Sequence, residues 1–160
     1  MTGLHNRRYF ARELERLLAE QPGDWFSLAV VDLDHFKAIN DRFGHEIGDN
    51  VLVRVAALLC DVLRQPDIVV RSGGEEFLVL MPATEMNAAT ACCERIRQRI
   101  REEPWEHIAA GLIVTASVGV ASTNDPDQLA ALARSADERL YDAKRSGRDR
   151  VVSASRDSSG

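Results

Sequence analysis

Apolar residues recur along the chain with two different spacings, which predict alternating helices and strands. Apolar positions three and four residues apart predict helices over residues 6–20, 35–43, 49–63, 86–101 and 127–146. Runs rich in β-forming residues, bounded by turn residues, predict strands over residues 25–32, 67–71, 76–81, 112–121 and 150–153. The first of these strands is almost continuously apolar, which is typical of a strand buried on both faces.

The order of these elements predicts the fold class. Its centre runs β-α-β-β-α-β, which is the split-βαβ or ferredoxin-like arrangement. We expect an α+β domain with a mostly antiparallel central sheet surrounded by helices, which cover one of its faces. An additional N-terminal helix and a C-terminal strand complete the domain. In this arrangement the first strand lies beside the hairpin formed by the second and third strands.

The composition fits one compact domain and excludes some partners. The chain has 160 residues, of which 45% are hydrophobic, and a net charge of −5 without a long basic run. A non-specific surface for a nucleic-acid polymer is therefore excluded. The three cysteines, Cys60, Cys92 and Cys93, lie in helix-like apolar stretches and indicate buried thiols in a reducing cytosol.

The ends of the chain carry no targeting signal. Because the sequence has neither a signal peptide nor an apolar run long enough to span a bilayer, we expect a cytoplasmic domain without membrane contact. The domain is expected to occupy residues 1–152, with a flexible tail over residues 153–160. Both ends resemble those of a domain cut from a longer protein.

The predicted hairpin carries the most informative polar residues. A turn of Ser72, Gly73 and Gly74 is followed by the adjacent carboxylates Glu75 and Glu76. The glycines allow positive φ and close approach of another group to the backbone. In a strand the two glutamates would point to opposite faces, so only one could easily share a site with a neighbouring strand. The pattern suits a metal ion carrying a phosphorylated ligand, and the alternative is a solvated hairpin tip.

A second carboxylate site follows the first strand. Asp32 ends this strand, and its adjacency to the hairpin would bring Asp32 close to Glu75. Oxygen ligands without nearby histidine or cysteine favour Mg²⁺ or Mn²⁺ over Zn²⁺. The alternative is that Asp32 and Asp34 only solvate the end of the strand.

Two segments could bind phosphate groups. Free N–H groups at the start of the helix after Asp34 could cradle a phosphate beside Lys37, although Asp34 could instead be an N-cap. Lys144 and Arg148 close the last long helix and could neutralise terminal phosphates during transfer. Cations at a helix C-terminus also favour the helix dipole, which is the structural alternative.

A base could be recognised between the short helix and the long helix. Asn40 and Asp49 flank the connection over residues 44–48. A carboxylate that accepts hydrogen bonds from guanine N1 and N2, with an amide near the same edge, would recognise this base. Asp49 could also be the cap of the long helix.

These residues together resemble the GGDEF-domain family of diguanylate cyclases. The resemblance spans almost the whole chain and rests on the ordered motifs 2–8 (TGLHNRR), 32–37 (DLDHFK) with 40–41 (ND), 44–45 (GH) with 48–49 (GD), 73–77 (GGEEF), 115–121 (TASVGVA), 136–137 (AD), 140–141 (LY), 143–144 (AK) and 147–148 (GR). The resemblance implies a palm of the nucleotidyl cyclase type that condenses two GTP molecules into cyclic di-GMP and two pyrophosphates. Two domains would meet antiparallel as a homodimer, so that each 3′-hydroxyl attacks the α-phosphorus held by the partner.

The resemblance also implies roles for individual residues. Asp32, Glu75 and the carbonyl of Leu33 would hold Mg²⁺ or Mn²⁺, and Glu76 would help with the metal or activate the hydroxyl. The substrate contacts implied are Phe36, Lys37 and Gly74 at the phosphate-binding turns, Lys144 and Arg148 on the outer phosphates, and Asn40 and Asp49 on guanine.

An inhibitory product site is implied by the same resemblance. Arg64 and Asp67 match its Arg-x-x-Asp motif in register before the signature, and Arg95 is the candidate for the assisting arginine. The alternative is a helix-end arginine followed by a proline turn. Cyclic di-GMP would then be both the product and an inhibitor.

The sequence departs from the family pattern in three places. Ser72 replaces a larger residue, Asp149 places a negative charge near the phosphate-binding cations, and the Asp that normally precedes Thr2-Gly3-Leu4 is missing. None of these changes affects the expected metal ligands.

Three other functions fit parts of this pattern. The first is a catalytically silent GGDEF domain that binds GTP or cyclic di-GMP. The second is a relative that uses ATP, against which Asp49 argues, and the third is a ferredoxin-like interaction module, which would not need this set of acids and cations. A sensor or regulatory domain would lie N-terminal to these residues.

Overall fold

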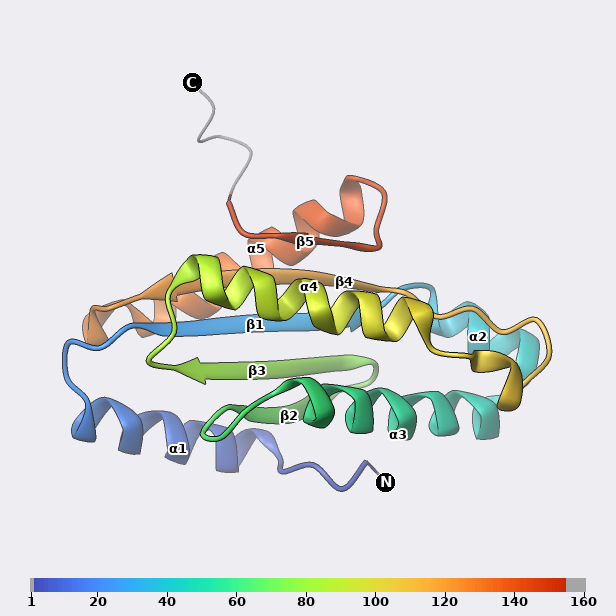
Figure 1. Ribbon diagram of the computed structural model, residues 1–160, viewed down its shortest axis with the longest axis horizontal. Helices are drawn as coiled ribbons and strands as arrows, with labels where there is room; N and C mark the ends of the chain where they lie inside the picture. Colours follow the sequence, from blue (N-terminus) through green and yellow to red (C-terminus); the bar gives the residue numbers. More distant parts are fainter. Residues whose placement is uncertain (1, 155–160) are drawn as a thin grey trace.

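The computed structural model describes residues 2–154 and shows five strands between helices (Figure 1). The elements follow in the order α1 (Arg7–Glu20), β1 (Phe26–Leu33), α2 (Phe36–Phe43), α3 (His45–Val62), β2 (Ile68–Gly73), β3 (Glu76–Pro82), α4 (Met86–Glu102), β4 (Ala116–Thr123), α5 (Leu129–Arg145) and β5 (Arg150–Val152). Two short 3₁₀ turns, Trp105–His107 and Pro126–Gln128, lie between α4 and β4 and before α5. No helix in this part of the chain combines the length and apolar character needed to span a bilayer.

The strands form a single sheet in the order β2-β3-β1-β4-β5. Neighbouring strands run antiparallel except for β4 and β5, which are parallel. The first four strands have the ferredoxin-like order, so the predicted α+β fold is confirmed. The central position of β1 between β3 and β4 places its C-terminal end beside both the hairpin and the start of β4.

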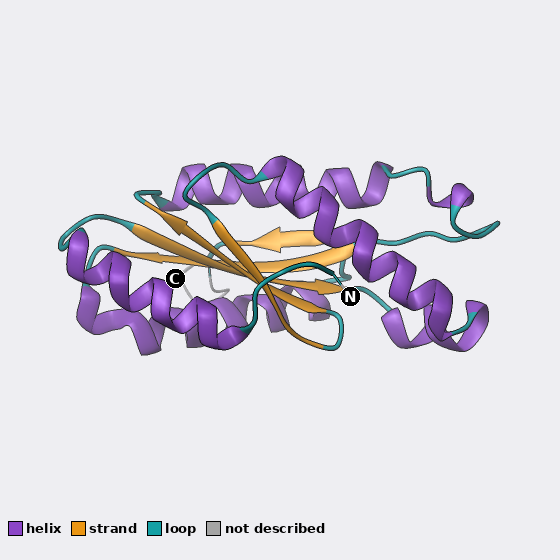
Figure 2. Cartoon of the chain, turned by 90° about the horizontal axis from the view of Figure 1, so that it is seen from below, coloured by secondary structure: helices purple, strands orange, loops and turns teal. Residues whose placement is uncertain are grey.

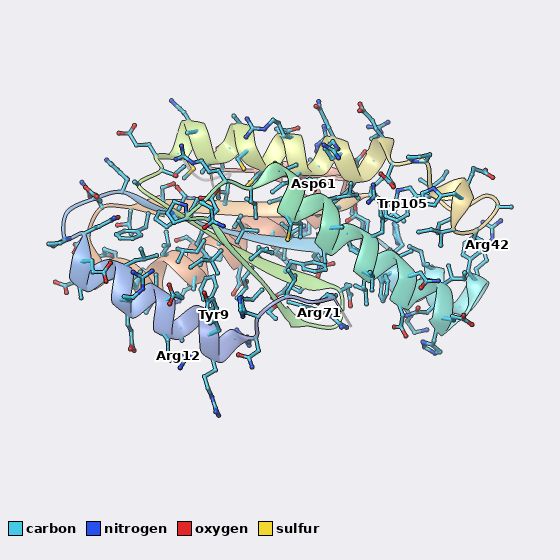
Figure 3. All side chains as sticks on the ribbon, turned by 60° about the horizontal axis from the view of Figure 1, so that its bottom comes forward. Tyr9, Arg12, Arg42, Asp61, Arg71 and Trp105 are labelled. Carbon is cyan, nitrogen blue, oxygen red and sulfur yellow. The ribbon has the colours of Figure 1, made fainter. Side chains whose placement is uncertain are left out.

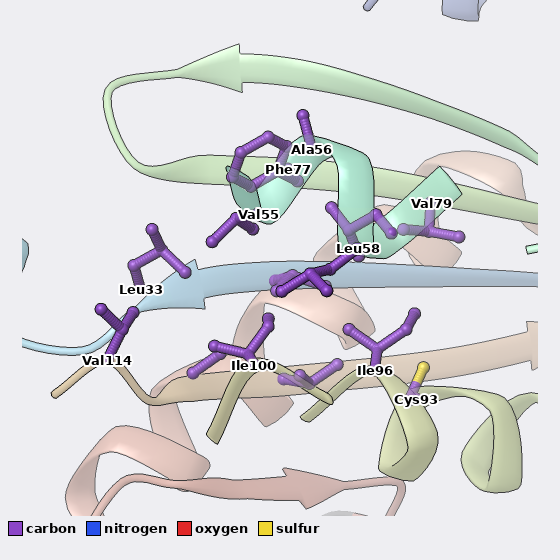
Figure 4. Packing of buried hydrophobic residues seen from close by; sticks show 14 of the residues in the cluster. Leu33, Val55, Ala56, Leu58, Phe77, Val79, Cys93, Ile96, Ile100 and Val114 are labelled. Carbon is purple, nitrogen blue, oxygen red and sulfur yellow. The ribbon is translucent and has the colours of Figure 1, made fainter. Parts of the chain in front are cut away.

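Helices cover both faces of the sheet (Figure 2). The core under α3 and α4 includes Val31 of β1, whereas the core under α1 and α5 includes its neighbour Val30. Figure 4 shows the first of these cores, with Leu58 and Ile96 pointing toward the sheet. The expectation that helices cover one face was therefore wrong for α1 and α5. The reason is that all eight residues of β1 are buried, and alternate residues need cover on opposite sides.

Two element boundaries differ from the prediction by four residues at their N-terminal ends. α3 begins at His45 rather than at residue 49, because Gly44, with φ of 94°, turns the chain directly from α2 into α3. β4 begins at Ala116 rather than at residue 112. The preceding segment includes the 3₁₀ turn at Trp105, whose indole N–H donates to the carbonyl of Ile100 at 2.8 Å (Figure 3).

The hairpin is tighter than expected. Gly73 is the last residue of β2, and Gly74 and Glu75 form the turn, so the predicted Ser72-Gly73-Gly74 turn was displaced by about one residue. The Gly74 φ of 51° supplies the left-handed step of this turn. Arg71 (Figure 3) closes the turn because its Nε donates to the carbonyl of Gly74 at 2.8 Å.

A glycine in β4 allows α5 to lie directly on the sheet. A Cβ at Gly119 would lie 2.1 Å from the carbonyl oxygen of Ala136 and 2.3 Å from the backbone nitrogen of Leu140. The close approach fixes the axis of α5 and therefore the position of its C-terminal residues. The predicted tail over residues 153–160 lies mostly outside the described residues.

Candidate active site

Three carboxylates gather where β1 meets the hairpin. Asp32 of β1 stands directly opposite Glu76 of β3 in the antiparallel register. The N–H of Leu33 donates to the carbonyl of Glu75 at 3.3 Å, which fastens the turn to the end of β1. The predicted proximity of the first strand and the hairpin is therefore present.

The two adjacent glutamates are not arranged as alternate residues of one strand. Glu76 lies on the face of the sheet under α1 and α5, with Leu78 and Leu80 lining the same groove, and Asp32 follows Val30 on this face. Glu75 belongs to the turn. The expected strand alternation of the two glutamates therefore does not apply, since Glu75 is a turn residue.

A lysine from α5 completes this corner. Lys144 Nζ lies 3.1 Å from Oδ2 of Asp32, whose residue surface is 7% exposed. Burial raises the pKa of Asp32 above its ordinary value, Lys144 opposes this rise, and the negative charges of Glu75 and Glu76 add to it. An additional cation nearby would stabilise the ionised form of a buried carboxylate that lies beside like charges.

The residues present fit a divalent metal ion. Asp32, the carbonyl of Leu33 and Glu75 offer only oxygen donors, which suit Mg²⁺ or Mn²⁺. Within residues 2–154, no group of three or more Asp, Glu, His or Cys side chains is arranged to hold a metal ion. A metal ion here would therefore use the backbone carbonyl and substrate oxygens as further ligands.

The start of α2 has no side-chain cap. His35 stands at the N-cap position with a left-handed φ of 54°, and its side chain makes no capping hydrogen bond. The first N–H groups of α2, beginning at Phe36, are consequently not capped by this side chain. The suggestion that Asp34 caps this helix was wrong, because its carboxylate accepts hydrogen bonds from Thr115 and Ser117 instead.

Lys37 forms an exposed ion pair within α2. Its side chain is 90% exposed, and Nζ lies 3.0 Å from Oδ2 of Asp41 one turn later on α2. An exposed pair of this kind contributes little to stability. The side chain is thus available to an incoming ligand at small cost.

The two cations at the end of α5 lie on one tight turn. The N–H of Arg148 donates to the carbonyl of Ala143 at 3.0 Å, which wraps the chain back over the last turn that carries Lys144. The charge of Asp149 was expected to act on these cations. Its carboxylate instead pairs with Arg97 and Arg101 of α4 at 2.8 and 2.9 Å.

Asn40 of α2 lies against Gly48, the residue before Asp49, where α2 packs against α3. A Cβ at Gly48 would lie 1.8 Å from Oδ1 of Asn40, so the glycine makes room for this amide. Asp49 is exposed and lies within α3, and Gly44 occupies the N-cap position. The suggestion that Asp49 caps the helix was therefore wrong, and its carboxylate is open to a ligand.

The three residues of the expected product site line a single cavity. Arg64, Asp67 and Arg95 surround a cavity of about 360 Å³ together with residues of β3 and α4. The backbone N–H of Arg64 donates to Oδ2 of Asp67 at 3.2 Å. Oδ1 of Asp67 is buried and makes no hydrogen bond within residues 2–154, and burial raises the pKa of this carboxyl group.

Two interactions near the carboxylates were not predicted from the sequence. The hydroxyl of Ser72 donates to Oε1 of Glu76 at 3.0 Å, so the departure at this position places a polar partner beside the signature. Asp34 is bound by groups far away along the chain. Thr115 and Ser117, two hydroxyl residues in one motif, were the only available signal for this contact.

Comparison with known proteins decides the family. Residues 1–150 match the family model described as "Diguanylate cyclase, GGDEF domain". The chain belongs to the GGDEF domain family. It is 45% identical over 157 residues to the response regulator PleD of Caulobacter vibrioides, an alignment that covers 95% of this chain and 35% of PleD.

Solved GGDEF structures have the same fold. Diguanylate cyclase SiaD of Pseudomonas aeruginosa, solved with its activator SiaC, matches with a TM-score of 0.87 and 41% identity over 96% of this chain and 60% of SiaD. The GGDEF domain of DgcB from Caulobacter crescentus, solved with c-di-GMP, matches with a TM-score of 0.86 and 35% identity over 94% of this chain and 91% of that domain. The chain spans about a third of the length of PleD.

Proposed function

We propose that this GGDEF domain is a diguanylate cyclase that condenses two GTP molecules into cyclic di-GMP. In each of the two steps, a 3′-oxygen forms a bond to an α-phosphorus, pyrophosphate leaves with the bonding electrons, and the hydroxyl proton passes to a base. The observation that carries the proposal is the corner formed by Asp32, Glu75, Glu76 and Lys144. It combines a buried carboxylate, two adjacent acids and a cation at 3.1 Å.

The acids would hold the metal ion and manage the proton. Asp32, the carbonyl of Leu33 and Glu75 would bind Mg²⁺ or Mn²⁺, which when bound would neutralise phosphate charge. Glu76 lies opposite Asp32 and accepts a hydrogen bond from Ser72, which orients its carboxylate. We assign to Glu76 the activation of the attacking hydroxyl.

The phosphates and the base would be held by different elements. Phe36 and Lys37 at the start of α2, with Gly74 in the hairpin turn, are suited to the phosphate chain. Lys144 and Arg148 would neutralise its outer groups, as positioning and charge stabilisation account for most of the catalysis in phosphoryl transfer. Asn40 and Asp49 are suited to the guanine edge.

One domain would supply half of the reaction centre. Each domain holds one GTP, so the two 3′-hydroxyls reach the two α-phosphates only when two copies meet antiparallel as a homodimer. We further propose that the domain is controlled by a regulatory or sensor domain, because it covers 35% of a relative named a response regulator.

The product is proposed to bind at a second site. The cavity between β3 and α4 offers two guanidinium groups, those of Arg64 and Arg95, to the phosphates of cyclic di-GMP, and Asp67 fixes the backbone at Arg64. Arginine forks match phosphate oxygens well. Binding there would inhibit the enzyme.

The decisive test is incubation with GTP and Mg²⁺ over a range of protein concentrations. We expect cyclic di-GMP and pyrophosphate in a 1:2 ratio, with a rate that rises with the square of protein concentration while the chain is mainly monomeric. The Glu20→Gln variant, which changes an exposed ion pair on α1 (2.8 Å to Arg16), serves as a control and should form cyclic di-GMP at the parent rate. Absence of cyclic di-GMP over the full range would contradict the proposal, and GTP or cyclic di-GMP binding without turnover would identify a regulatory module.

A further inference from the structure

Asp34 is a buried carboxylate that accepts hydrogen bonds from two distant parts of the chain. It is 5% exposed and follows the end of β1. Its Oδ1 accepts from the hydroxyl of Ser117 at 2.6 Å, and its Oδ2 accepts from the hydroxyl of Thr115 at 2.7 Å and from the backbone N–H of Asp149 at 3.0 Å. The side chain therefore joins β1 to β4 and to the turn after α5.

Asp149 is held on its other side by α4. Its Oδ1 lies 2.8 Å from Arg97 Nη1 and its Oδ2 lies 2.9 Å from Arg101 Nη1. The backbone of Asp149 thus contacts Asp34 while its side chain contacts two arginines one turn apart. These contacts fasten the residue between the sheet and α4.

The turn between α5 and β5 needs such contacts. Arg148 and Asp149 have φ values of 65° and 46°, and both are non-glycine residues in the left-handed region. This conformation is unfavourable for residues with a Cβ and persists where surrounding contacts impose it. The hydrogen bond to Asp34 and the two ion pairs of Asp149 are contacts of this kind.

The fastened turn carries the cations assigned to the outer phosphates. Arg148 immediately precedes Asp149, and its N–H closes the last turn of α5, where Lys144 reaches Asp32. Asp34 lies two residues beyond Asp32 on the same chain segment. The carboxylate corner and the cation turn are therefore tied to one another through Asp34.

We propose that Asp34 and Asp149 are positioning residues that hold Arg148 and Lys144 over the phosphate chain of the nucleotide. The proposal rests on the proposed function, because it presumes that a triphosphate binds at this corner. Neither residue touches the substrate in this role. Their removal should weaken contacts to the outer phosphates and leave recognition of the base intact.

The test compares GTP with GMP, which lacks the outer phosphates. Binding of each nucleotide in the presence of Mg²⁺ is measured by isothermal titration for the parent chain, Asp34→Asn, Asp149→Ala and Asp149→Asn. Because a hydrogen bond to a charged group is worth about tenfold or more in an equilibrium constant, we expect Asp34→Asn and Asp149→Ala to bind GTP about tenfold more weakly. Their GMP affinity should change less than about twofold.

Asp149→Asn and Asp61→Asn serve as the comparisons. Asparagine at residue 149 keeps the backbone N–H and an acceptor for an arginine, so GTP binding should lie close to the parent value. Asp61→Asn removes a different α4 pair, with Arg99 at 3.7 Å, and should change neither affinity. A merely structural role would lower GTP and GMP affinity together and would not be rescued by asparagine.

Amide hydrogen exchange provides a second measurement if a substitution also lowers the stability of the domain. We expect faster amide exchange at Asp149 in Asp34→Asn, with unchanged exchange in β1 and β3. If Asp34→Asn and Asp149→Ala both keep the parent's ratio of GTP to GMP affinity, the positioning role is overturned and the proposed function is not affected. Failure of the parent chain to bind GTP would contradict the proposed function itself, and this inference with it.

Discussion

Lys144 Nζ lies 3.1 Å from Oδ2 of Asp32, so the last turn of α5 is paired with the end of the central strand. The contact joins a cation assigned to phosphate with a carboxylate assigned to metal. The pair brings opposite charges to one corner of the domain.

Loss of either carboxylate assigned to the metal ion should abolish turnover while the domain stays folded. We expect Asp32→Asn and Glu75→Gln to lower the rate of cyclic di-GMP formation by about 100-fold or more, since each removes a charge from the reaction centre. The backbone carbonyl of Glu75, which accepts from Leu33, is unaffected by the change. Turnover and far-UV circular dichroism are measured together, and undiminished synthesis by either variant would refute the metal assignment.

Gly119→Ala should destabilise the fold. The added Cβ would meet backbone atoms of α5 at 2.1 and 2.3 Å, and backbone cannot turn aside as a flexible side chain can. We expect a loss of about 3 kcal/mol in the free energy of unfolding, measured by urea denaturation. A midpoint equal to that of the parent chain would show that α5 can move away from β4 without cost.

Gly48→Ala should act on the base site instead. Its Cβ would meet the side-chain oxygen of Asn40 at 1.8 Å, and this side chain can rotate away. Replacing glycine within a helix favours folding by up to about 1 kcal/mol, and the crowding of Asn40 opposes this gain, so the melting temperature should be nearly unchanged. We expect GTP affinity to fall about tenfold, equivalent to about 1.4 kcal/mol, because Asn40 is displaced.

The affinity of Gly48→Ala for ATP can be compared directly with its affinity for GTP. If Asn40 and Asp49 recognise guanine, the variant should lose discrimination between GTP and ATP, and binding of both nucleotides by titration measures this. A variant that keeps the parent's preference for GTP would argue against Asn40 as a base contact.

Arg64→Ala should remove the binding of cyclic di-GMP at the cavity beside α4. Isothermal titration with the product, without GTP, measures this site. Arg99→Ala is the matched control, because Arg99 is another α4 arginine, pairs with Asp61 and does not line the cavity. Equal product affinity in the Arg64 variant and the parent chain would exclude the cavity as the inhibitory site.

Asp67 should make the stability of the domain depend on pH. Its pKa is raised in the folded protein, so between the ordinary carboxyl pKa of 3.8 and the raised value the folded state binds more protons than the unfolded state. This contribution to stability therefore increases as pH falls through that range and is absent above it. Asp67→Asn should reduce this dependence, which is measured by urea denaturation at a series of pH values, and an identical profile would contradict the assignment.

The local patterns predicted most of the fold. Helical spacing and apolar runs located the five strands and five α-helices seen over residues 2–154, because burial of one helix face or of both strand faces leaves a periodic pattern in the sequence. The boundaries at His45 and Ala116 were missed, since a glycine hinge and an irregular loop leave no such trace. The apolar first strand implied that helices cover both faces of the sheet, but the packing of α1 and α5 on the second face was not predicted from it.

What the sequence by itself determined was the family motif, its residues and the chemistry those residues can support. Oxygen donors, cations and glycines at fixed spacing are properties of the chain. Only the tertiary structure decided which of them meet. The register of β1 against β3 set Asp32 opposite Glu76, and the axis of α5 brought Lys144 to Asp32. The buried Asp34 joined a turn 115 residues away, because contacts between distant segments arise from packing and not from local pattern.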